Sequence, residues 1–309
     1  MIGRIVEVAD DRRHLFVSRG FMVVKNTEGD REELGQVPLD DIAAVIANAH
    51  GLSYTNNLLV ALAERGAPFV LCAANHNVSG MLWPVSGNHQ QARRIDAQLS
   101  VHRPLQKRLW ADIIRCKLQQ QAAVLEAVNA PFAPLSALAK KVRSGDPNNF
   151  EAQGARRYWP LLFGDTFRRD QKRNGCNSQL NYGYTVLRAA MARSVIAAGL
   201  HPTLGIHHSN AGNPMRLVDD LMEPFRPIID LHVLQLQRSG ENGITPDSKR
   251  ALVHTLYDDM QTDSGVTPVS SCMQRLTISL VQIYLGEREK LDLPLPGLPL
   301  SLAESLTGD

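Results

Sequence analysis

The sequence predicts an α+β protein, with a small N-terminal β-rich domain followed by a larger all-α domain. Residues 2–85 consist mostly of short alternating or β-branched runs separated by turn signals, a pattern typical of strands. From about Ser86 onward the pattern changes to long helical periodicities with few β-branched runs. We therefore expect three parts: residues 1–85, residues 86–290, and a Leu/Pro-rich tail at 291–309.

The N-terminal part is predicted to hold one helix, at 55–65, which Gly66 would end. The run at 42–47 is continuously apolar and indicates a strand buried on both faces. No nucleophile elbow and no glycine-rich phosphate loop occurs in this part, so we place no catalytic motif there. The remaining strands are expected at 2–8, 14–18, 21–25, 34–37, 68–72 and 78–84.

The second part is predicted to be helical throughout. Pro104 and Pro134 suit the first turn of a helix, and the stretches 145–149 and 201–205 are plausible breaks. The tail alternates Leu and Pro, and we expect it to lie outside the core, as a disordered segment or an extended arm that docks elsewhere. The helices are expected at 89–100, 104–129, 134–143, 150–163, 179–198, 215–237, 247–261 and 269–287.

Composition describes an ordinary soluble globular protein, with 21% charged and 44% hydrophobic residues. Residues 1–30 carry charges throughout and show no signal peptide, and no apolar run approaches the roughly 20 residues of a membrane span. The four cysteines are scattered without a CxxC pair, which argues against a zinc knuckle and a disulfide framework. We expect a reduced, cytoplasmic compartment and no membrane association.

Basic residues are concentrated in the middle of the chain. Residues 86–200 contain 18 Lys and Arg against 7 Asp and Glu, although the net charge of the whole chain is only +2. Residues 1–85 contain 7 Lys and Arg against 10 Asp and Glu, and residues 201–309 contain 8 Lys and Arg against 14 Asp and Glu. Each phosphate that a basic surface neutralises releases condensed counterions, so this asymmetry favours a polyanion partner. A solvated helical surface is the alternative interpretation.

Two acidic residues lie three apart in the predicted helix at 215–237. Asp220 and Glu223 would share one helix face with several apolar residues. Like charges on such a face are costly unless a cation lies between them, which is a first indication of a metal site. Ion pairs within the helix are the alternative, Asp220 with Arg216 and Glu223 with Arg226.

A loop rich in Gly and Asn precedes this helix and carries His207 and His208. Either imidazole could be a metal ligand, although His208 could equally cap a helix or pack in the core. A further acidic candidate, Glu151, follows Asn148 and Asn149, either of which would be a good N-cap. Favourable interaction with the helix dipole would by itself explain an acidic residue in the first turn.

Glu151 begins a strongly basic stretch that also contains aromatic residues. Carboxylate and imidazole ligands together suit Mg²⁺ or Mn²⁺ rather than a structural zinc ion. Such an ion near phosphates would polarise a scissile phosphodiester and lower the pKa of an attacking hydroxyl or water. The candidates for contacts with a polyanion are Arg156, Arg157, Arg168, Arg169, Lys172 and Arg173.

A third stretch, 177–187, contains several polar residues at a predicted helix start. Asn177 or Ser178 could cap that helix, and Asn181, Tyr182 and Tyr184 place polar groups on its first turns. The simplest interpretation is a helix start packed against a neighbouring element.

Three stretches of the sequence together resemble the CRISPR-associated integrase family, whose members capture foreign DNA as new spacers. They are EAQGARRYW from Glu151, NSQLNYGYTVLRAAMARSVIAAGLHPTLGIHH from Asn177, and LVDDLMEPFRPIID from Leu217, in that order. The resemblance covers most of residues 150–230, and motifs of this length are specific. It agrees with a β-rich N-terminal part followed by a helical domain.

The resemblance implies that Glu151, His208 and Glu223 bind a divalent ion, Mg²⁺ or Mn²⁺. It also implies that Asp220 is an adjacent acidic residue of the catalytic site. These four residues are therefore the expected catalytic group, and the first three of them are the expected metal ligands.

Two doublets leave the assignment ambiguous by one residue. His208 is preferred over His207 because the histidine of the family follows a Gly and two intervening residues. Asp220 is preferred over Asp219 because of its three-residue spacing from Glu223. The sequence alone leaves both alternatives open.

Family members catalyse metal-dependent transesterification, in which a 3′-hydroxyl of the incoming DNA attacks a phosphodiester at each end of the first repeat. They also cut branched DNA. The resemblance thus implies a metal-dependent DNA integrase and endonuclease of CRISPR adaptation, in the cytoplasm of a prokaryote, with residues 86–290 as the catalytic, DNA-binding domain. The compact length looks most like the type II branch.

The resemblance also implies partners. We expect double-stranded DNA, both the incoming fragment and the CRISPR repeat, and a homodimer formed through residues 1–85. Two such dimers would flank a dimer of a small CRISPR adaptation partner protein, which gives a heterohexamer. Because backbone contacts carry little sequence information, the incoming sequence should matter little.

Two other function classes remain open at this point. A non-catalytic DNA-binding scaffold of a nucleoprotein complex would use the acidic residues as helix caps and ion pairs, and would need no metal. A metallohydrolase acting on small phosphoesters would need no basic surface. Metal dependence separates the first alternative from the integrase, and the basic section argues against the second.

Overall fold

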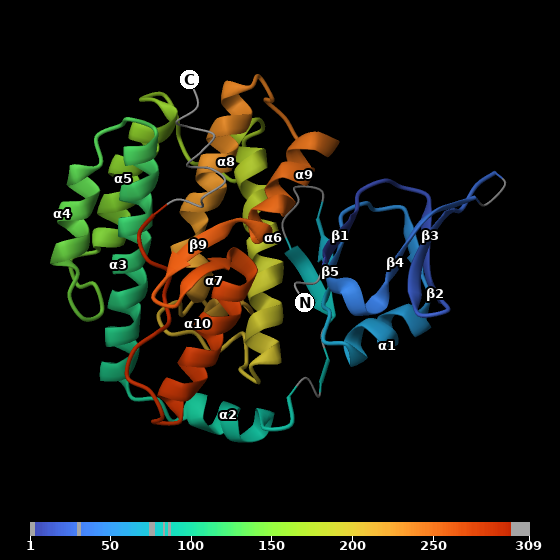
Figure 1. Ribbon diagram of the computed structural model, residues 1–309, viewed down its shortest axis with the longest axis horizontal. Helices are drawn as coiled ribbons and strands as arrows, with labels where there is room; N and C mark the ends of the chain where they lie inside the picture. The colour runs from blue at the N-terminus through green and yellow to red at the C-terminus, as the bar shows by residue number, and fades with distance from the viewer. Residues whose placement is uncertain (1–3, 30–31, 74–77, 83, 86–87, 298–309) are drawn as a thin grey trace.

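The computed structural model describes all residues except 1–3, 30–31, 74–77, 83, 86–87 and 298–309, and it has the predicted α+β architecture. The strands of the N-terminal part lie at one end of the molecule, and the helices of the remaining chain form the larger body at the other end (Figure 1). No helix in these described ranges combines the length and apolarity that a membrane span requires. The fold class is confirmed.

The N-terminal part contains two four-stranded sheets, with strand orders β1-β5-β7-β8 and β4-β3-β2-β6. In the first sheet β1, β5 and β7 run parallel, and β8 pairs antiparallel with β7. The described elements of this part are β1 (Arg4–Val8), β2 (Arg13–Ser18), β3 (Phe21–Asn26), β4 (Glu33–Pro38), β5 (Ile42–Ala47), β6 (Leu52–Tyr54), α1 (Asn56–Glu64), β7 (Phe69–Cys72) and β8 (Val78–Leu82). Every strand predicted here has a counterpart among these elements, and β6 is the one described strand of this part that was not predicted.

The strand β5 is buried along its whole length because it separates two hydrophobic cores. Ala44 and Ile46 belong to the core of the helical body, whereas Ile42 and Val45 belong to a smaller core under α1. A continuous apolar run is what a strand covered on both faces requires. The first sheet therefore joins the β-rich part to the helices, and the boundary near residue 85 remains a prediction.

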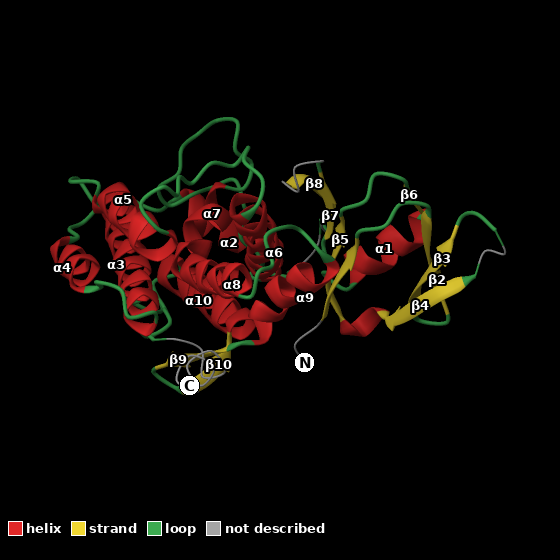
Figure 2. Cartoon of the chain, turned by 90° about the horizontal axis from the view of Figure 1, so that it is seen from above, coloured by secondary structure: helices red, strands yellow, loops and turns green. Residues whose placement is uncertain are grey.

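The helical body is built around two long helices, α3 and α6, and it also holds one two-stranded hairpin, which Figure 2 shows apart from the two N-terminal sheets. Its elements are α2 (Gln91–Leu99), α3 (Arg103–Ala127), α4 (Ala133–Lys141), α5 (Phe150–Phe163), α6 (Cys176–Ala197), α7 (Arg216–Met222), the 3₁₀ turn η2 (Glu223–Phe225), α8 (Arg226–Arg238), α9 (Pro246–His254), the 3₁₀ turn η3 (Thr255–Tyr257), β9 (Asp259–Thr262), β10 (Gly265–Pro268) and α10 (Val269–Tyr284).

The prediction of one helix over 215–237 was wrong, because α7, η2 and α8 follow one another there. Pro224 and Pro227 lack the backbone N–H that would continue the hydrogen-bond ladder, so the chain passes through a 3₁₀ turn while its dihedral angles stay helical. The 3₁₀ turn begins at Glu223, one of the predicted site residues.

The predicted helix over 247–261 is wrong in its second half. The helix α9 ends at His254, and β9 then pairs antiparallel with β10 around the turn at Asp263 and Ser264. The helical part is therefore not all-α. A further correction concerns α6, which begins at Cys176 with Gly175 as its N-cap, so neither Asn177 nor Ser178 caps it.

A polar cluster fixes the first sheet against the helical body. The carboxylate of Glu7 on β1 accepts hydrogen bonds from Tyr182 Oη at 2.5 Å and from Asn48 Nδ2 at 2.7 Å, and it lies 3.0 Å from Lys249 Nζ on α9. Tyr182 lies in the polar stretch whose simplest interpretation was packing against a neighbour. That interpretation is confirmed for this residue.

The described part of the tail docks against the helices as an extended arm. Leu295 donates its backbone N–H to Gln261 O on β9, and its carbonyl accepts a hydrogen bond from Gln120 Nε2 on α3. Leu291 is buried in the larger core, contrary to the expectation that the tail lies outside it. The rest of the predicted tail, 298–309, lies outside the described residues.

Candidate active site

A buried lysine lies at the centre of the candidate site. Lys117 extends from the middle of α3, and only 7% of its surface is exposed. Its ammonium nitrogen Nζ lies 2.8 Å from Glu151 Oε1 on α5 and 2.5 Å from Glu223 Oε2 at the start of η2. No sequence pattern singled out Lys117, and it joins two predicted site residues that are 72 positions apart.

Close packing of α5 against α3 lets Glu151 reach this lysine. A Cβ atom at Gly154 would lie 2.3 Å from Leu118 Cδ2, so a larger residue there would require the buried Leu118 side chain to shift. Asn149 caps α5, as predicted, and the buried carboxylate of Asp146 accepts the backbone N–H groups of Phe150 and Glu151. Glu151 is therefore held in the first turn of a well-capped helix.

Glu223 is almost fully buried and faces two cations. Its Oε1 lies 3.0 Å from Arg226 Nε, and its Oε2 lies close to Lys117 without forming a well-directed hydrogen bond. Burial alone would raise the pKa of Glu223, but Arg226 and Lys117 together outweigh it and hold that pKa below its usual value. The ion pair with Arg226 that the sequence left open is therefore present.

Asp220 organises the histidine loop. Its carboxylate is completely buried and accepts the backbone N–H groups of Ile206, His207 and His208, at 2.6, 3.0 and 3.2 Å. Its Oδ1 also lies 2.6 Å from His208 Nδ1. In this structure the two carboxylates have separate protein partners, and the suggestion that one cation lies between Asp220 and Glu223 stays a prediction.

The loop needs glycine at position 205. A Cβ atom there would lie 2.8 Å from the carbonyl oxygen of His208 and 3.0 Å from Asp220 Oδ2, and neither atom can move without breaking the loop. Gly205 thus permits the close approach that brings the backbone N–H groups onto the carboxylate.

The two histidines have different environments. The ring of His207 stacks on Trp110 of α3, with ring centres 4.2 Å apart, and burial lowers the pKa of His207. The hydrogen bond with Asp220 raises the pKa of His208. A histidine whose Nδ1 is held by a carboxylate has Nε2 free to bind a metal, which is the usual arrangement of metal-binding histidines. The geometry therefore favours His208 over His207 as a ligand.

The donor set fits a divalent cation that prefers oxygen ligands. Glu151 and Glu223 each direct one oxygen at a single positive charge, and Glu223 Oε2 is buried without a hydrogen-bond partner. Within the described ranges, however, no three His, Cys, Asp or Glu side chains are close enough together to hold an ion. Lys117 occupies the position between the two carboxylates.

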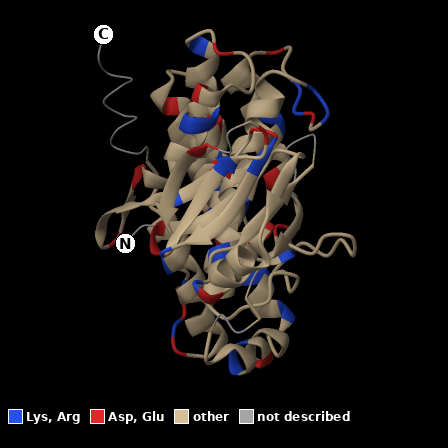
Figure 3. Cartoon of the chain, turned by 90° about the vertical axis from the view of Figure 1, so that its right-hand side faces the viewer, with Lys and Arg blue, Asp and Glu red and all other residues tan. Residues whose placement is uncertain are grey.

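Most of the predicted DNA-binding residues lie on the surface. The charged side chains of residues 156, 157, 168, 172 and 173 are exposed. Arg169 is partly buried, because its guanidinium donates to Asn177 Oδ1 and Asn181 Oδ1. Viewed from the side of the N-terminal sheets, basic and acidic residues are interspersed (Figure 3), so this side shows no single basic face.

The family model described as "CRISPR associated protein Cas1" matches residues 6–247 of this sequence. The chain belongs to the Cas1 family. It is 37% identical over 269 residues to the CRISPR-associated endonuclease Cas1 of Neisseria meningitidis serogroup C (strain 8013), a match that covers 85% of this chain and 88% of the relative. The recognition from sequence motifs is therefore confirmed.

Solved structures support the same fold for this Cas1-family chain. A casposase bound to integration product superposes with a TM-score of 0.79 at 21% identity, covering 94% of this chain and 92% of the casposase chain. A chain of a Cas6-RT-Cas1–Cas2 complex superposes with a TM-score of 0.76 at 15% identity, covering 96% of this chain and 36% of the longer one. At these identities the likeness concerns the fold.

A polar cavity of about 290 Å³ in this Cas1-family chain is lined by residues of α6, α7 and α8 and of the segment before α6. Three arginines line it, and Arg188 forms a bidentate pair with Asp219, whose carboxylate oxygens lie 2.8 and 2.9 Å away. This pairing separates the two residues of the acidic doublet, because Asp219 binds an arginine while Asp220 holds the histidine loop. Its lining residues are Arg169, Gln171, Asn181, Tyr184, Thr185, Arg188, Asp219, Met222 and Arg226.

Asp230→Asn should remove a destabilisation that grows with pH. Asp230 is buried beneath the cavity, where it accepts a hydrogen bond from Tyr184 Oη at 2.5 Å, and burial raises its pKa from 3.8 to about 7. The folded state therefore retains the proton more strongly than the unfolded state, so stability falls as pH rises from about 4 to 7. Above pH 7 the cost should reach a few kcal/mol.

Thermal unfolding of the Asp230→Asn variant and the wild type should be compared from pH 4.5 to pH 8. The melting temperature of the variant, relative to that of the wild type, should increase across this range and then stay constant. A difference that is independent of pH would contradict the raised pKa.

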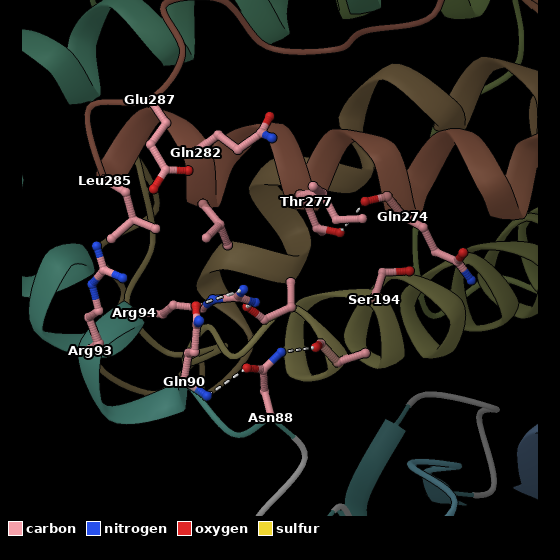
Figure 4. Close-up of a pocket in the computed structure, with 14 residues that line it drawn as sticks. Asn88, Gln90, Arg93, Arg94, Ser194, Gln274, Thr277, Gln282, Leu285 and Glu287 are labelled. Carbon is pink, nitrogen blue, oxygen red and sulfur yellow. Dashed lines mark hydrogen bonds between the residues drawn. The ribbon is translucent and has the colours of Figure 1, made fainter.

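A separate cavity of about 590 Å³ lies between α2, the end of α6 and α10 (Figure 4). Two of its polar side chains cap α6, since Asn88 Nδ2 donates to Ala197 O and Arg94 Nη1 donates to Ala198 O, each at 2.9 Å. None of the four predicted catalytic residues lines this cavity. Its polar groups fasten α2 to α6, and they explain how the connection after the β-rich part is anchored.

Proposed function

We propose that this Cas1-family chain is a metal-dependent DNA integrase and endonuclease of CRISPR adaptation. The observation that carries the proposal is the convergence of Glu151 and Glu223 on the buried end of Lys117, within a chain of the Cas1 family. The Neisseria relative is named an endonuclease, and the casposase neighbour is titled as bound to integration product. Both names support phosphodiester chemistry on DNA.

In this proposal Glu151, Glu223 and His208 hold one Mg²⁺ or Mn²⁺. When bound, the ion would polarise the scissile phosphodiester and lower the pKa of the attacking 3′-hydroxyl or water. Asp220 acts as a positioning residue, because it fixes the backbone of the histidine loop and orients His208 through Nδ1. Arg226 keeps Glu223 charged in its buried position.

The substrate in this proposal is double-stranded DNA, held by the exposed basic residues of the middle section. The Cas6-RT-Cas1–Cas2 neighbour supports a partner protein, and we propose a homodimer that assembles with a small partner into a heterohexamer. The cytoplasmic location also remains a proposal.

Metal removal should separate this function from that of a non-catalytic scaffold. Purified protein should cut branched DNA and join a DNA 3′ end to a repeat-containing target in Mn²⁺, and both activities should disappear in EDTA and return with excess Mn²⁺. Retention of the DNA should be followed in the same samples by a gel-shift assay. Equal cleavage with and without EDTA, or DNA binding without any cleavage, would contradict the proposal.

A further inference from the structure

Lys117 lies where a charged side chain is costly unless it is neutralised. Its neighbours on α3, Cys116 and Leu118, are also buried, and burial of an ammonium group requires close negative partners. Glu151 and Glu223 supply two carboxylate oxygens within 2.8 Å. The lysine is therefore part of a buried charge cluster.

The two carboxylates depend on Lys117 to different degrees. Glu223 has a second cation, Arg226, at 3.0 Å. For Glu151, Lys117 is the one cation within ion-pair distance among the residues that the structure describes. Loss of the ammonium would leave two negative groups facing each other, of which Glu223 is buried and Glu151 is about one third exposed.

The ammonium and a divalent ion cannot both take the same position. An ion bound by Glu151 and Glu223 needs an oxygen from each, and the two oxygens directed at a common point are the ones that Lys117 contacts. The remaining oxygen of Glu223 faces Arg226. Lys117 thus lies where an ion bound by both carboxylates would lie.

We propose that Lys117 is a built-in counter-ion that joins Glu151 and Glu223 in the metal-free protein and competes with the divalent cation for the same two carboxylates. The competition rests on the proposed function, whereas the counter-ion role does not. In the metal-free state the lysine keeps the two acidic groups together and stabilises the site. Metal binding then requires the ammonium to give up at least one carboxylate. The affinity for the divalent ion is therefore reduced by the free energy of the lysine–carboxylate contact that is lost.

The test uses Lys117→Met in the full-length protein, because methionine keeps an unbranched stem and removes only the charge. In EDTA the melting temperature of the variant should fall by about 5 °C or more, since an unpaired buried charge is strongly destabilising. In a calorimetric titration Mn²⁺ should bind the variant at least about tenfold more tightly than the wild type, because a competing charge is gone. Mn²⁺ should also raise the melting temperature of the variant by more than it raises that of the wild type.

Two further variants test whether the effects come from the charge at position 117 and from the two carboxylates that it contacts. Lys107→Met removes a charge from an exposed position of the same helix, and it should change neither the melting temperature nor the Mn²⁺ affinity appreciably. The double variant Lys117→Met with Glu151→Gln should be more stable in EDTA than Lys117→Met alone, because it relieves the repulsion between the two carboxylates.

An unchanged melting temperature of Lys117→Met in EDTA would overturn the counter-ion role. Weaker or equal Mn²⁺ binding by this variant would overturn the competition. If the wild type bound no Mn²⁺ at all, the competition and the proposed metal-dependent function would both be wrong, and the melting temperatures in EDTA would still decide the counter-ion role.

Discussion

Glu223→Gln should reduce strand transfer and cleavage by at least about a hundredfold, and DNA binding should stay within a few-fold of the wild type. The substitution keeps the shape of the side chain and removes the negative charge that faces Lys117 and Arg226. A neutral amide is a poor ligand for Mg²⁺ or Mn²⁺ in place of a carboxylate, so the ion should be lost at working concentrations. Exposed arginines and lysines supply most of the proposed DNA contacts and are unchanged.

The measurement is the initial rate of strand transfer in Mn²⁺, with DNA binding and the melting temperature followed in parallel. Asp258→Asn is a suitable control, because Asp258 is a buried carboxylate paired with His232 at 2.6 Å and is not part of the lysine-centred cluster. This control should lose stability and keep its activity per folded molecule. Strand transfer by Glu223→Gln at half the wild-type rate would exclude Glu223 as a metal ligand.

Asp220→Ala should strongly lower the free energy of unfolding. It removes an acceptor that is completely buried and satisfies three backbone N–H groups and one imidazole. Buried donors left unpaired cost about 1–3 kcal/mol each when no water reaches them, so a loss of about 3–5 kcal/mol is expected. The histidine loop should lose its shape, and activity should fall with it.

Unfolding in urea and strand transfer should be measured together for this variant, at a temperature where it remains folded. Asp219→Ala is the matched comparison, because the neighbouring carboxylate is partly exposed and pairs with Arg188 at the surface of the polar cavity. We expect Asp219→Ala to be clearly less destabilising. Similar losses for the two variants would contradict the role of Asp220 in organising the loop.

The N-terminal strands and the helix α5 could be read directly from the sequence, because they depend on local patterns. The apolar run of β5 and the alternating runs around it specify strands through side-chain periodicity alone, and the cap at Asn149 fixes the start of α5. Glu151 was therefore placed correctly in a first helical turn. The break at Glu223 was also encoded locally, by Pro224 and Pro227, and it was missed because the apolar periodicity continues through it.

The direction in which each acidic side chain points could not be predicted from spacing. A separation of three residues places Asp220 and Glu223 on one face of a helix, but two residues on the same face can still contact different neighbouring elements. The loop at 205–208 closes over Asp220, and α3 passes over Glu223. Which element covers which residue depends on how helices distant in the sequence pack together.

Local periodicity and long motifs in the sequence were enough to predict the fold class, most strands and helices, the family, and the residue types available for a metal site. Only the tertiary structure revealed Lys117, since a single lysine in a long helix carries no local sign of burial. The packing of α3 between α5 and η2 brings Glu151 and Glu223 onto one ammonium group. Charges separated by many residues become partners only when the fold excludes water from between them.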